Sequence, residues 1–301
     1  MNGIIVLDKP PDMTSAQVVA RVKRITKAKK VGHTGTLDPF ATGVLVCCMN
    51  RATRLVQFLT HGTKRYDGKM RLGIQTDTQD FTGEVISRRP CSAVTDQDVE
   101  RAFRRFEKVK QQSPPAYSAV KHRGVPLYRL ARRGTFVKKP PRPISIHTFQ
   151  VREIDLPDVR FEICCSAGTY VRTVCADVGE ALGCGAHLTA LRRMENGRFT
   201  LDEAISLDRL QELADAGRIL DHVIPMGVAL RGVPGISADN ALVDRIRHGD
   251  RLAQGEVAGV ADKVCPWIKV TDSHGNLVAV MHSTKKHGVH PYACVFPALD
   301  A

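Results

Sequence analysis

Apolar residues in the first 220 positions form two patterns, short continuous runs and amphipathic stretches. The runs have the length and composition of buried strands, whereas apolar positions spaced three or four residues apart, such as Val18, Val22 and Ile25, predict helices. We predict strands over residues 3–7, 44–49, 65–72, 144–154 and 160–166. We predict helices from Thr14 or Ser15 through Ile25, and over residues 52–59, 95–106, 173–182 and 206–216.

Two segments interrupt this order. Residues 113–143 are rich in proline and basic side chains and have no sustained period, so we predict a long excursion from the core. The linker at residues 231–235 precedes short strand-like runs at 267–270 and 277–282, which a turn signal at 272–275 separates. We therefore place a domain boundary between residues 230 and 231. Strands and helices do not alternate regularly, which argues against a doubly wound parallel sheet.

The amino-acid composition indicates the environment in which we expect the protein to work. With 43% hydrophobic and 25% charged residues among 301, the chain has the make-up of a soluble globular protein. No apolar run approaches the ~20 residues that cross a membrane, and the start lacks the pattern of a signal peptide. The nine cysteines include no Cys-x-x-Cys pair, so we predict reduced thiols, no metal site and a cytoplasmic location.

The charge distribution points to a polyanionic partner. The net charge is +13, and residues 108–152 contain basic side chains, Arg132 and Arg133 among them, but no Asp or Glu. Tyr117, Tyr128 and Phe136 are interleaved with these cations, a combination that suits phosphate contact with some aromatic stacking. A second basic run at residues 21–30 is equally compatible with the solvated face of a helix.

Asp38 is the only acid in a loop, residues 32–45, that is crowded with glycine, threonine and proline. Gly32, Gly35 and Gly43 permit close backbone approach, and Pro39 keeps Asp38 out of the helical region. Such a loop could hold one carboxylate beside a ligand. The spacing by itself favours a simpler interpretation, a turn in which Asp38 bonds its own backbone.

Several runs together resemble one family. The Asp38 loop is similar to the signature loop of bacterial tRNA pseudouridine synthase B, the TruB family. Residues 3–15, 64–66, 117–121, 168–172 and 182–193 match further motifs of that family in the same order. One departure is Asp12, where glycine is usual. The resemblance covers most of residues 1–200 and is much weaker beyond about residue 230.

The resemblance implies an α+β fold with a mixed, largely antiparallel sheet and flanking helices. Residues 1–230 would form the catalytic domain, and residues 231–301 a small PUA-like β-barrel that binds RNA. Because every matched site residue precedes residue 200, we expect the catalytic part to fold without the tail. Tail cations suited to RNA contact are Arg245, Arg247, Arg251, Lys285 and Lys286.

The resemblance also implies roles for particular residues. Asp38 would be the catalytic carboxylate, acting on the base, on the sugar or in proton removal, and Arg172 would bind it bidentately. Tyr66, the third catalytic residue with Asp38 and Arg172, would stack on the flipped uracil and take part in the proton transfer at C5. The substrate-binding residues would be His33, Lys9, Tyr170, Leu191, Arg132 and Arg133. Residue type alone gives simpler interpretations: a surface arginine, packed tyrosines, a loop histidine bonded to backbone. Asp67, Asp77 and Asp80 are predicted to be turn residues.

The implied activity is isomerisation of uridine-55 in the T-loop of tRNA, with no cofactor, no metal and no protein partner. The C-terminal domain would reach the acceptor stem. Two alternatives stay open: a non-catalytic tRNA-binding or RNA-folding protein on the same scaffold, and a guide-RNA-dependent synthase. Intact matches at Asp38, Tyr66 and Arg172 favour the enzyme over the non-catalytic protein, and the weak C-terminal resemblance argues against the guide-dependent type.

Overall fold

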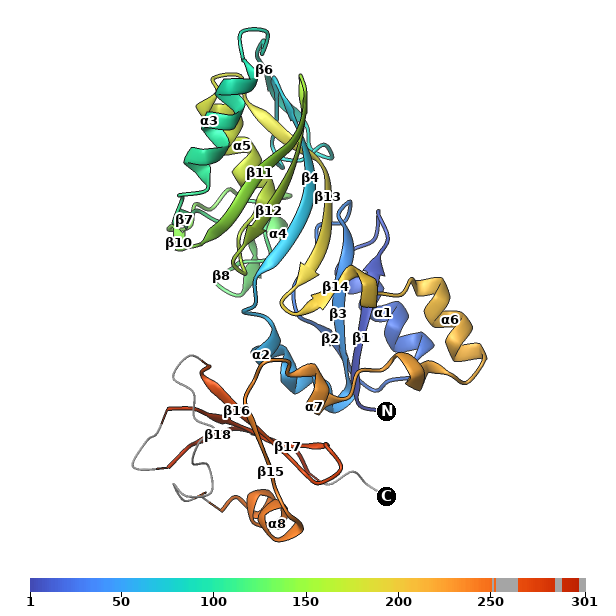
Figure 1. Ribbon diagram of the computed structural model, residues 1–301. Helices are drawn as coiled ribbons and strands as arrows, with labels where there is room; N and C mark the ends of the chain where they lie inside the picture. Colours follow the sequence, from blue (N-terminus) through green and yellow to red (C-terminus); the bar gives the residue numbers. More distant parts are fainter. Residues whose placement is uncertain (251, 253–264, 285–288, 298–301) are drawn as a thin grey trace.

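The computed structural model describes residues 1–250, 252, 265–284 and 289–297. A mixed sheet runs through the upper and middle parts of Figure 1 in the order β1-β3-β13-β4-β12-β11. These strands are β1 (Gly3–Lys9), β3 (Thr42–Met49), β13 (Ala186–Asn196), β4 (Lys64–Leu72), β12 (Asp158–Cys165) and β11 (Ile146–Asp155). Two short strands extend it, β2 (Val31–His33) beside β3 and β14 (Phe199–Thr200) beside β13.

Strand directions in this sheet confirm the predicted mixed, largely antiparallel arrangement. Neighbours on the β1-to-β11 path are antiparallel except β3 and β13, which run parallel where Arg192 and Arg193 lie opposite Thr42 and Gly43. The Asp38 loop leads into β3, so it lies close to this parallel junction. The junction therefore brings residues far apart in sequence to the base of one loop.

Alternation along β1 explains how helices cover the sheet. Ile5 and Leu7 pack with Val18 and Val22 of α1 (Ser15–Ile25) and with Leu210 of α6 (Leu207–Asp215). Ile4 and Val6 face the opposite side and join another apolar cluster. At the other end of the sheet, α3 (Asp96–Phe106) and α5 (Val171–Ala181) pack on β4, β11 and β12 (Figure 1).

Most predicted elements are present, and their caps follow from the sequence. Thr14 caps α1 and Thr95 caps α3, each in a capping box. The helix predicted over residues 52–59 is instead a 3₁₀ helix, η1 (Asn50–Leu55), followed by one α-helical turn, α2 (Val56–Leu59). The sequence pattern does not predict strands β2 and β13. Residues 186–196 include the adjacent pair Arg192 and Arg193 and have no regular alternation of apolar and polar side chains, so the pattern does not indicate the strand at the centre of the sheet.

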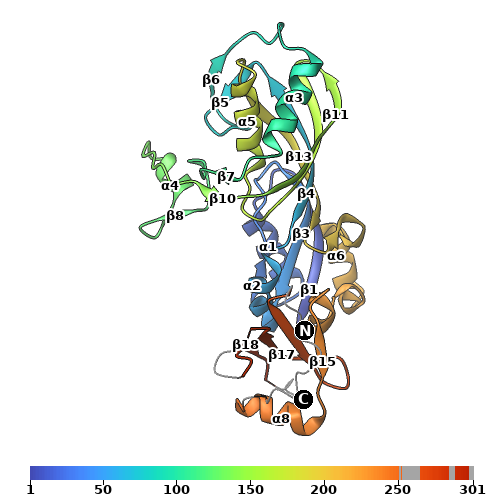
Figure 2. The same ribbon diagram turned by 60° about the vertical axis from the view of Figure 1, so that its left-hand side comes forward.

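The predicted excursion projects from the body of the protein, as Figure 2 shows. Its base is a two-stranded ribbon of β7 (Gln111–Gln112) and β10 (Arg142–Pro143). Beyond the base lie a hairpin, β8 (Lys121–His122) and β9 (Val125–Pro126), and the short helix α4 (Leu127–Ala131). A separate hairpin, β5 (Ile74–Thr76) and β6 (Val85–Arg88), follows β4.

The tail forms an open sheet in the part of the chain that the structure describes. Three short helices, η2 (Leu201–Glu203), η3 (Ile219–His222) and α7 (Met226–Ala229), precede it together with α6. The sheet order is β15 (Gly235–Ser237), β16 (Trp267–Thr271), β17 (Leu277–His282) and β18 (Tyr292–Val295), and α8 (Asn240–His248) follows β15. These strands close no barrel, so the predicted barrel stays a prediction. Three predicted RNA-contacting cations, Arg251, Lys285 and Lys286, lie outside the described residues.

One apolar cluster crosses the predicted domain boundary. Leu277, Val280 and Phe296 of the tail pack in the same cluster as Val44 and Val46 of β3. Next to it the rings of Phe58 and Trp267 meet edge to face at 4.9 Å, and Arg54 Nη1 donates to the Val295 carbonyl at 2.6 Å. Removing the tail would open this cluster to water, so the first 230 residues are not packed independently of it.

The described residues contain no helix that is long and apolar enough to cross a membrane. The nine cysteines are free thiols. Cys47 and Cys48 lie in β3 as predicted, and burial raises the pKa of each, to about 12 for Cys48. Among the same residues no group of three or more His, Cys, Asp or Glu side chains has the arrangement of a metal site.

Candidate active site around Asp38

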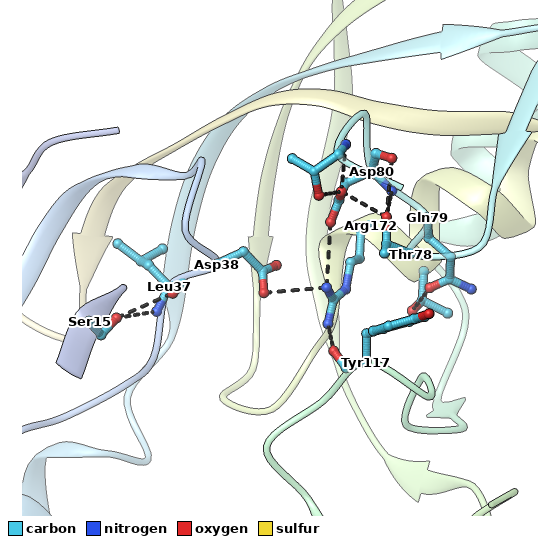
Figure 3. Close-up of polar contacts among 10 residues, drawn as sticks. Ser15, Leu37, Asp38, Thr78, Gln79, Asp80, Tyr117 and Arg172 are labelled. Atoms are coloured by element: carbon cyan, nitrogen blue, oxygen red, sulfur yellow. Dashed lines mark hydrogen bonds and ion pairs between the residues drawn. The ribbon is translucent and has the colours of Figure 1, made fainter. Parts of the chain in front are cut away.

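Two buried side chains hold the backbone on either side of Asp38. The Ser15 hydroxyl, at the start of α1, accepts from the Leu37 amide at 2.9 Å and donates to the Leu37 carbonyl at 3.3 Å (Figure 3). The Lys9 ammonium, at the end of β1, donates to the carbonyls of Pro10 and Pro39 at 2.8 Å each. Asp38 is therefore flanked by fixed residues, and its carboxylate direction is set by the surrounding fold.

Strand β13 holds the two ends of the loop. Arg193, only 1% exposed, donates from Nε to the Val44 carbonyl at 2.7 Å and from Nη2 to the Gly35 carbonyl at 3.0 Å. Asn196 donates to the Thr34 hydroxyl at 2.9 Å. Gly43 has φ of +97°, and a Cβ there would lie 2.2 Å from the Arg193 carbonyl oxygen, so only glycine fits.

Arg172 lies in the first turn of α5 and joins three segments of the chain. Its Nη1 is 3.4 Å from Asp38 Oδ1 and 3.6 Å from Asp80 Oδ2, and its Nη2 donates to the Tyr117 carbonyl (Figure 3). The predicted pairing of Arg172 with Asp38 is present. The predicted bidentate geometry is wrong, because the guanidinium shares its two terminal nitrogens among three acceptors.

Asp80 is a second carboxylate at the site that the sequence does not indicate. It lies in a turn, as predicted, but it is only 3% exposed. Its Oδ1 accepts from the Thr78 hydroxyl at 2.8 Å and from the amide and hydroxyl of Thr82 at 3.0 and 2.5 Å. These bonds satisfy one oxygen and leave the other facing Arg172. The neighbouring threonines in the sequence are local hydrogen-bond partners of Asp80, but its charged partner, Arg172, is distant in sequence.

The other two predicted turn acids differ from Asp80. Asp67 lies within β4, not in a turn, and is exposed. Asp77 accepts from the Glu84 amide at 2.8 Å, as a turn residue does, and also from the Tyr117 hydroxyl at 2.7 Å. The turn that carries Asp80 is thus bonded to the excursion at Tyr117.

The surroundings change the ionisation of the site. Burial raises the pKa of Asp38, the Arg172 guanidinium opposes this, and the Asp80 carboxylate adds to it. The Asp38 side chain is nevertheless 31% exposed, so it is open to a ligand on one side. Burial raises the pKa of Tyr66, which keeps the phenol neutral, and lowers that of Lys9 to about 8.

Two predicted pocket residues share one cluster with the Asp38 loop. Tyr66 on β4 and Leu191 on β13 are both buried, and both pack in the apolar cluster that includes Leu37. Tyr170 caps α5, and Gln112 fixes it by accepting from its amide at 2.8 Å and donating to its carbonyl at 3.1 Å. The Tyr170 ring lies 5.8 Å from the centre of the Arg172 guanidinium.

The remaining predicted residues are at the edge of the site or beyond it. His33 ends β2, where its Nδ1 accepts from the Gly35 amide at 3.2 Å, and burial together with Arg193 lowers its pKa. Arg132 and Arg133 are exposed on the excursion, and Arg132 lies 5.7 Å from the Tyr128 ring.

Asp12, the departure from the family pattern, has φ of +59°. That conformation explains why glycine is usual at this position. Aspartate is among the few other residues that adopt it readily, so the opening turn keeps its geometry.

Comparison with known proteins agrees with this geometry. The family model described as TruB family pseudouridylate synthase (N terminal domain) matches residues 23–171, and that of the tRNA pseudouridylate synthase B C-terminal domain matches residues 172–231. A solved structure titled as a Cbf5-Nop10-Gar1 complex shares the fold, with a TM-score of 0.74 and 29% identity over 97% of this chain and 84% of that one.

Relatives of similar length carry one name. The chain is 44% identical over 285 residues to tRNA pseudouridine synthase B of Syntrophus aciditrophicus (strain SB), covering 93% of this chain and 90% of the relative. It is 47% identical over 249 residues to the protein of that name from Geobacter sulfurreducens, covering 83% and 82%. With these identities, and with Asp38 in the signature loop facing Arg172, the chain belongs to the TruB family of pseudouridine synthases.

Proposed function

We propose that this protein isomerises uridine-55 in the T-loop of tRNA to pseudouridine, with Asp38 as the catalytic carboxylate. The observation that carries the proposal is the contact of Asp38 with Arg172, 3.4 Å apart, in a loop that four buried side chains anchor. The Asp38 side chain remains partly open to a ligand. Relatives named tRNA pseudouridine synthase B supply the substrate class.

The reaction breaks the bond between C1′ of the ribose and N1 of uracil, rotates the base, and joins C1′ to C5. A proton leaves C5 and another is gained at N1, so the atoms balance without an external group or electron. We therefore propose that neither cofactor nor metal takes part. The target base must leave the stack to reach Asp38, which means that the enzyme has to flip it out of the RNA.

Each side chain at the site has a part in this proposal. Arg172 stabilises the ionised form of Asp38 against the cost of burial. Tyr66, a neutral phenol, is suited to stack on the flipped uracil, with Tyr170 and Leu191 lining the base pocket. Lys9 supports the loop through Pro39, and His33 helps keep open the place that the base has left.

The excursion and the tail supply the RNA contacts. Arg132 and Arg133 are exposed on the excursion and would bind phosphates near the T-arm. The tail would complete a PUA-like domain that reaches toward the acceptor stem. We propose that the enzyme acts in the cytoplasm and without a protein partner. The Cbf5 protein, by contrast, was solved with Nop10 and Gar1.

The test is incubation of the purified protein with an unmodified tRNA transcript, followed by mapping of pseudouridine. Wild type should modify position 55. Asp38→Asn should form no product while tRNA binding stays within about tenfold, or ~1.4 kcal/mol. Asp67→Asn, which removes an exposed acid of β4, is the matched control and should keep full activity. Wild-type protein that binds tRNA yet makes no pseudouridine would favour the non-catalytic alternative.

A further inference from the structure

Phe81 is a large apolar side chain that the proposed mechanism does not use. It follows the buried Asp80 directly, yet it is 50% exposed. The two neighbours thus face opposite ways, Asp80 toward Arg172 and Phe81 toward solvent. Single exposed apolar residues are common on protein surfaces, so exposure alone decides nothing. What distinguishes Phe81 from other exposed apolar residues is its position beside the Asp38 loop.

The Phe81 ring is held against that loop. Its backbone amide donates to the Leu188 carbonyl of β13 at 2.9 Å, and Thr82 on its other side bonds the Asp80 carboxylate. The ring meets Phe40 edge to face, with centroids 5.3 Å apart and an interplanar angle of 72°. Phe40 is buried and lies two residues after Asp38. Phe81 is therefore an open aromatic surface on a fixed backbone at the rim of the site.

We propose that Phe81 stacks on an unpaired RNA base that flanks the flipped target uridine. This rests on the function proposed above and adds a substrate contact to it. Removing one base from the stack leaves its neighbours with uncovered faces, and aromatic side chains commonly cover such faces in RNA complexes. A protein with a net charge of +13 and an acid-free excursion favours RNA as the occupant over an apolar protein surface.

Three substitutions separate stacking from mere apolar contact. With a minimal T-arm stem-loop as substrate, Phe81→Ala should raise KM roughly 5- to 150-fold and leave kcat within about twofold, because stacking is worth ~1–3 kcal/mol per base. Phe81→Trp should keep a KM near wild type, since it retains an aromatic face. Phe81→Leu should behave like Phe81→Ala. The control is Leu220→Ala on η3, a residue 68% exposed and next to α6, which should change nothing.

Each result bears on the proposal. A KM for Phe81→Ala within twofold of wild type overturns it, and so does a leucine variant that binds as well as the tryptophan variant. Melting temperatures of the three variants show whether folding is intact. If Phe81→Ala proves unstable, the comparison of leucine with tryptophan still decides. If wild type forms no pseudouridine, the proposed function fails, and the dissociation constants of the same variants for the stem-loop still test stacking.

Discussion

Replacing Arg172 by lysine keeps a positive charge but removes the planar group that reaches three acceptors. A lysine ammonium is a point charge on a stem of different reach, so it can approach Asp38 or Asp80 but not both together with the Tyr117 carbonyl. Asp80 is the more buried carboxylate and is fixed by Thr78 and Thr82. We expect the ammonium to stay with Asp80 and to withdraw from Asp38.

The distances give the size of the effect. At the observed 3.4 Å and an effective dielectric constant of about 20, the attraction between Arg172 and Asp38 is ~5 kcal/mol. If the charge moves to about 6 Å, the attraction falls to ~3 kcal/mol. The ionised form of Asp38 thus loses ~2 kcal/mol, so at a pH where Asp38 is largely protonated in both proteins the rate of the variant should be roughly 30-fold lower. The loss also raises the pKa of Asp38, so the rate of the variant should recover as the pH increases.

The assay is single-turnover pseudouridine formation on a T-arm stem-loop between about pH 5.5 and 9.5. Arg71→Lys is the matched control. Arg71 makes a two-bond contact with Asp158, at 2.8 Å for each bond, but on the exposed surface of the sheet, where such a pair contributes at most ~1 kcal/mol. That control should keep full activity. A rate profile for Arg172→Lys that coincides with that of wild type over this pH range would refute the reasoning.

Three further predictions address other parts of the site. Asp80→Asn should move the acidic limb of the kcat profile to lower pH, because the Asp80 charge raises the pKa of Asp38, and an unchanged limb would contradict this. The second prediction concerns four cations of the excursion, Arg132, Arg133, Lys138 and Lys139. Neutralising them should reduce the slope of log K for tRNA against log salt by about 0.7–0.9 for each phosphate contact that is lost. An unchanged slope would show that these cations form a solvated surface. Deleting the chain from Gly232 onward should lower the melting temperature, because the apolar cluster that contains Phe296 and Val46 opens to water. The deletion should also raise KM for full-length tRNA more than it lowers kcat. A truncated protein as stable as wild type would show that the shared cluster contributes little.

The sequence predicts the parts of this fold in which local pattern and packing agree. Helix α1 has both an apolar stripe and a capping box, and its predicted start at Thr14 or Ser15 is confirmed. Strand β13 escapes prediction because charged residues interrupt its apolar positions, and one of them, Arg193, is buried. Arg193 is buried against the carbonyls of Val44 and Gly35, which lie in other strands and loops, and no local pattern reveals such partners.

The sequence likewise identifies some residues of the site and misses others. Asp38 and Arg172 could be identified because each lies in a run that resembles a motif of the family, whereas the residues of the Asp38 loop by themselves favour a simple turn. Asp80 could not, since the feature that distinguishes it is a partner in α5, far along the chain. The bidentate pairing expected of Arg172 failed for the same reason, because the second and third acceptors, Asp80 and the Tyr117 carbonyl, come from segments that only the fold brings together.

The connection through Arg172 links RNA binding to catalysis. Its guanidinium contacts Asp38 on one side and the Tyr117 carbonyl, near the base of the excursion, on the other. Tyr117 is also bonded to Asp77, in the turn that carries Asp80. Displacing the base of the excursion would therefore change the partners of Arg172 and with them the ionisation of Asp38. Substitution of Arg133, which is exposed on the excursion, should alter KM alone, whereas a change that moves Tyr117 should lower kcat as well.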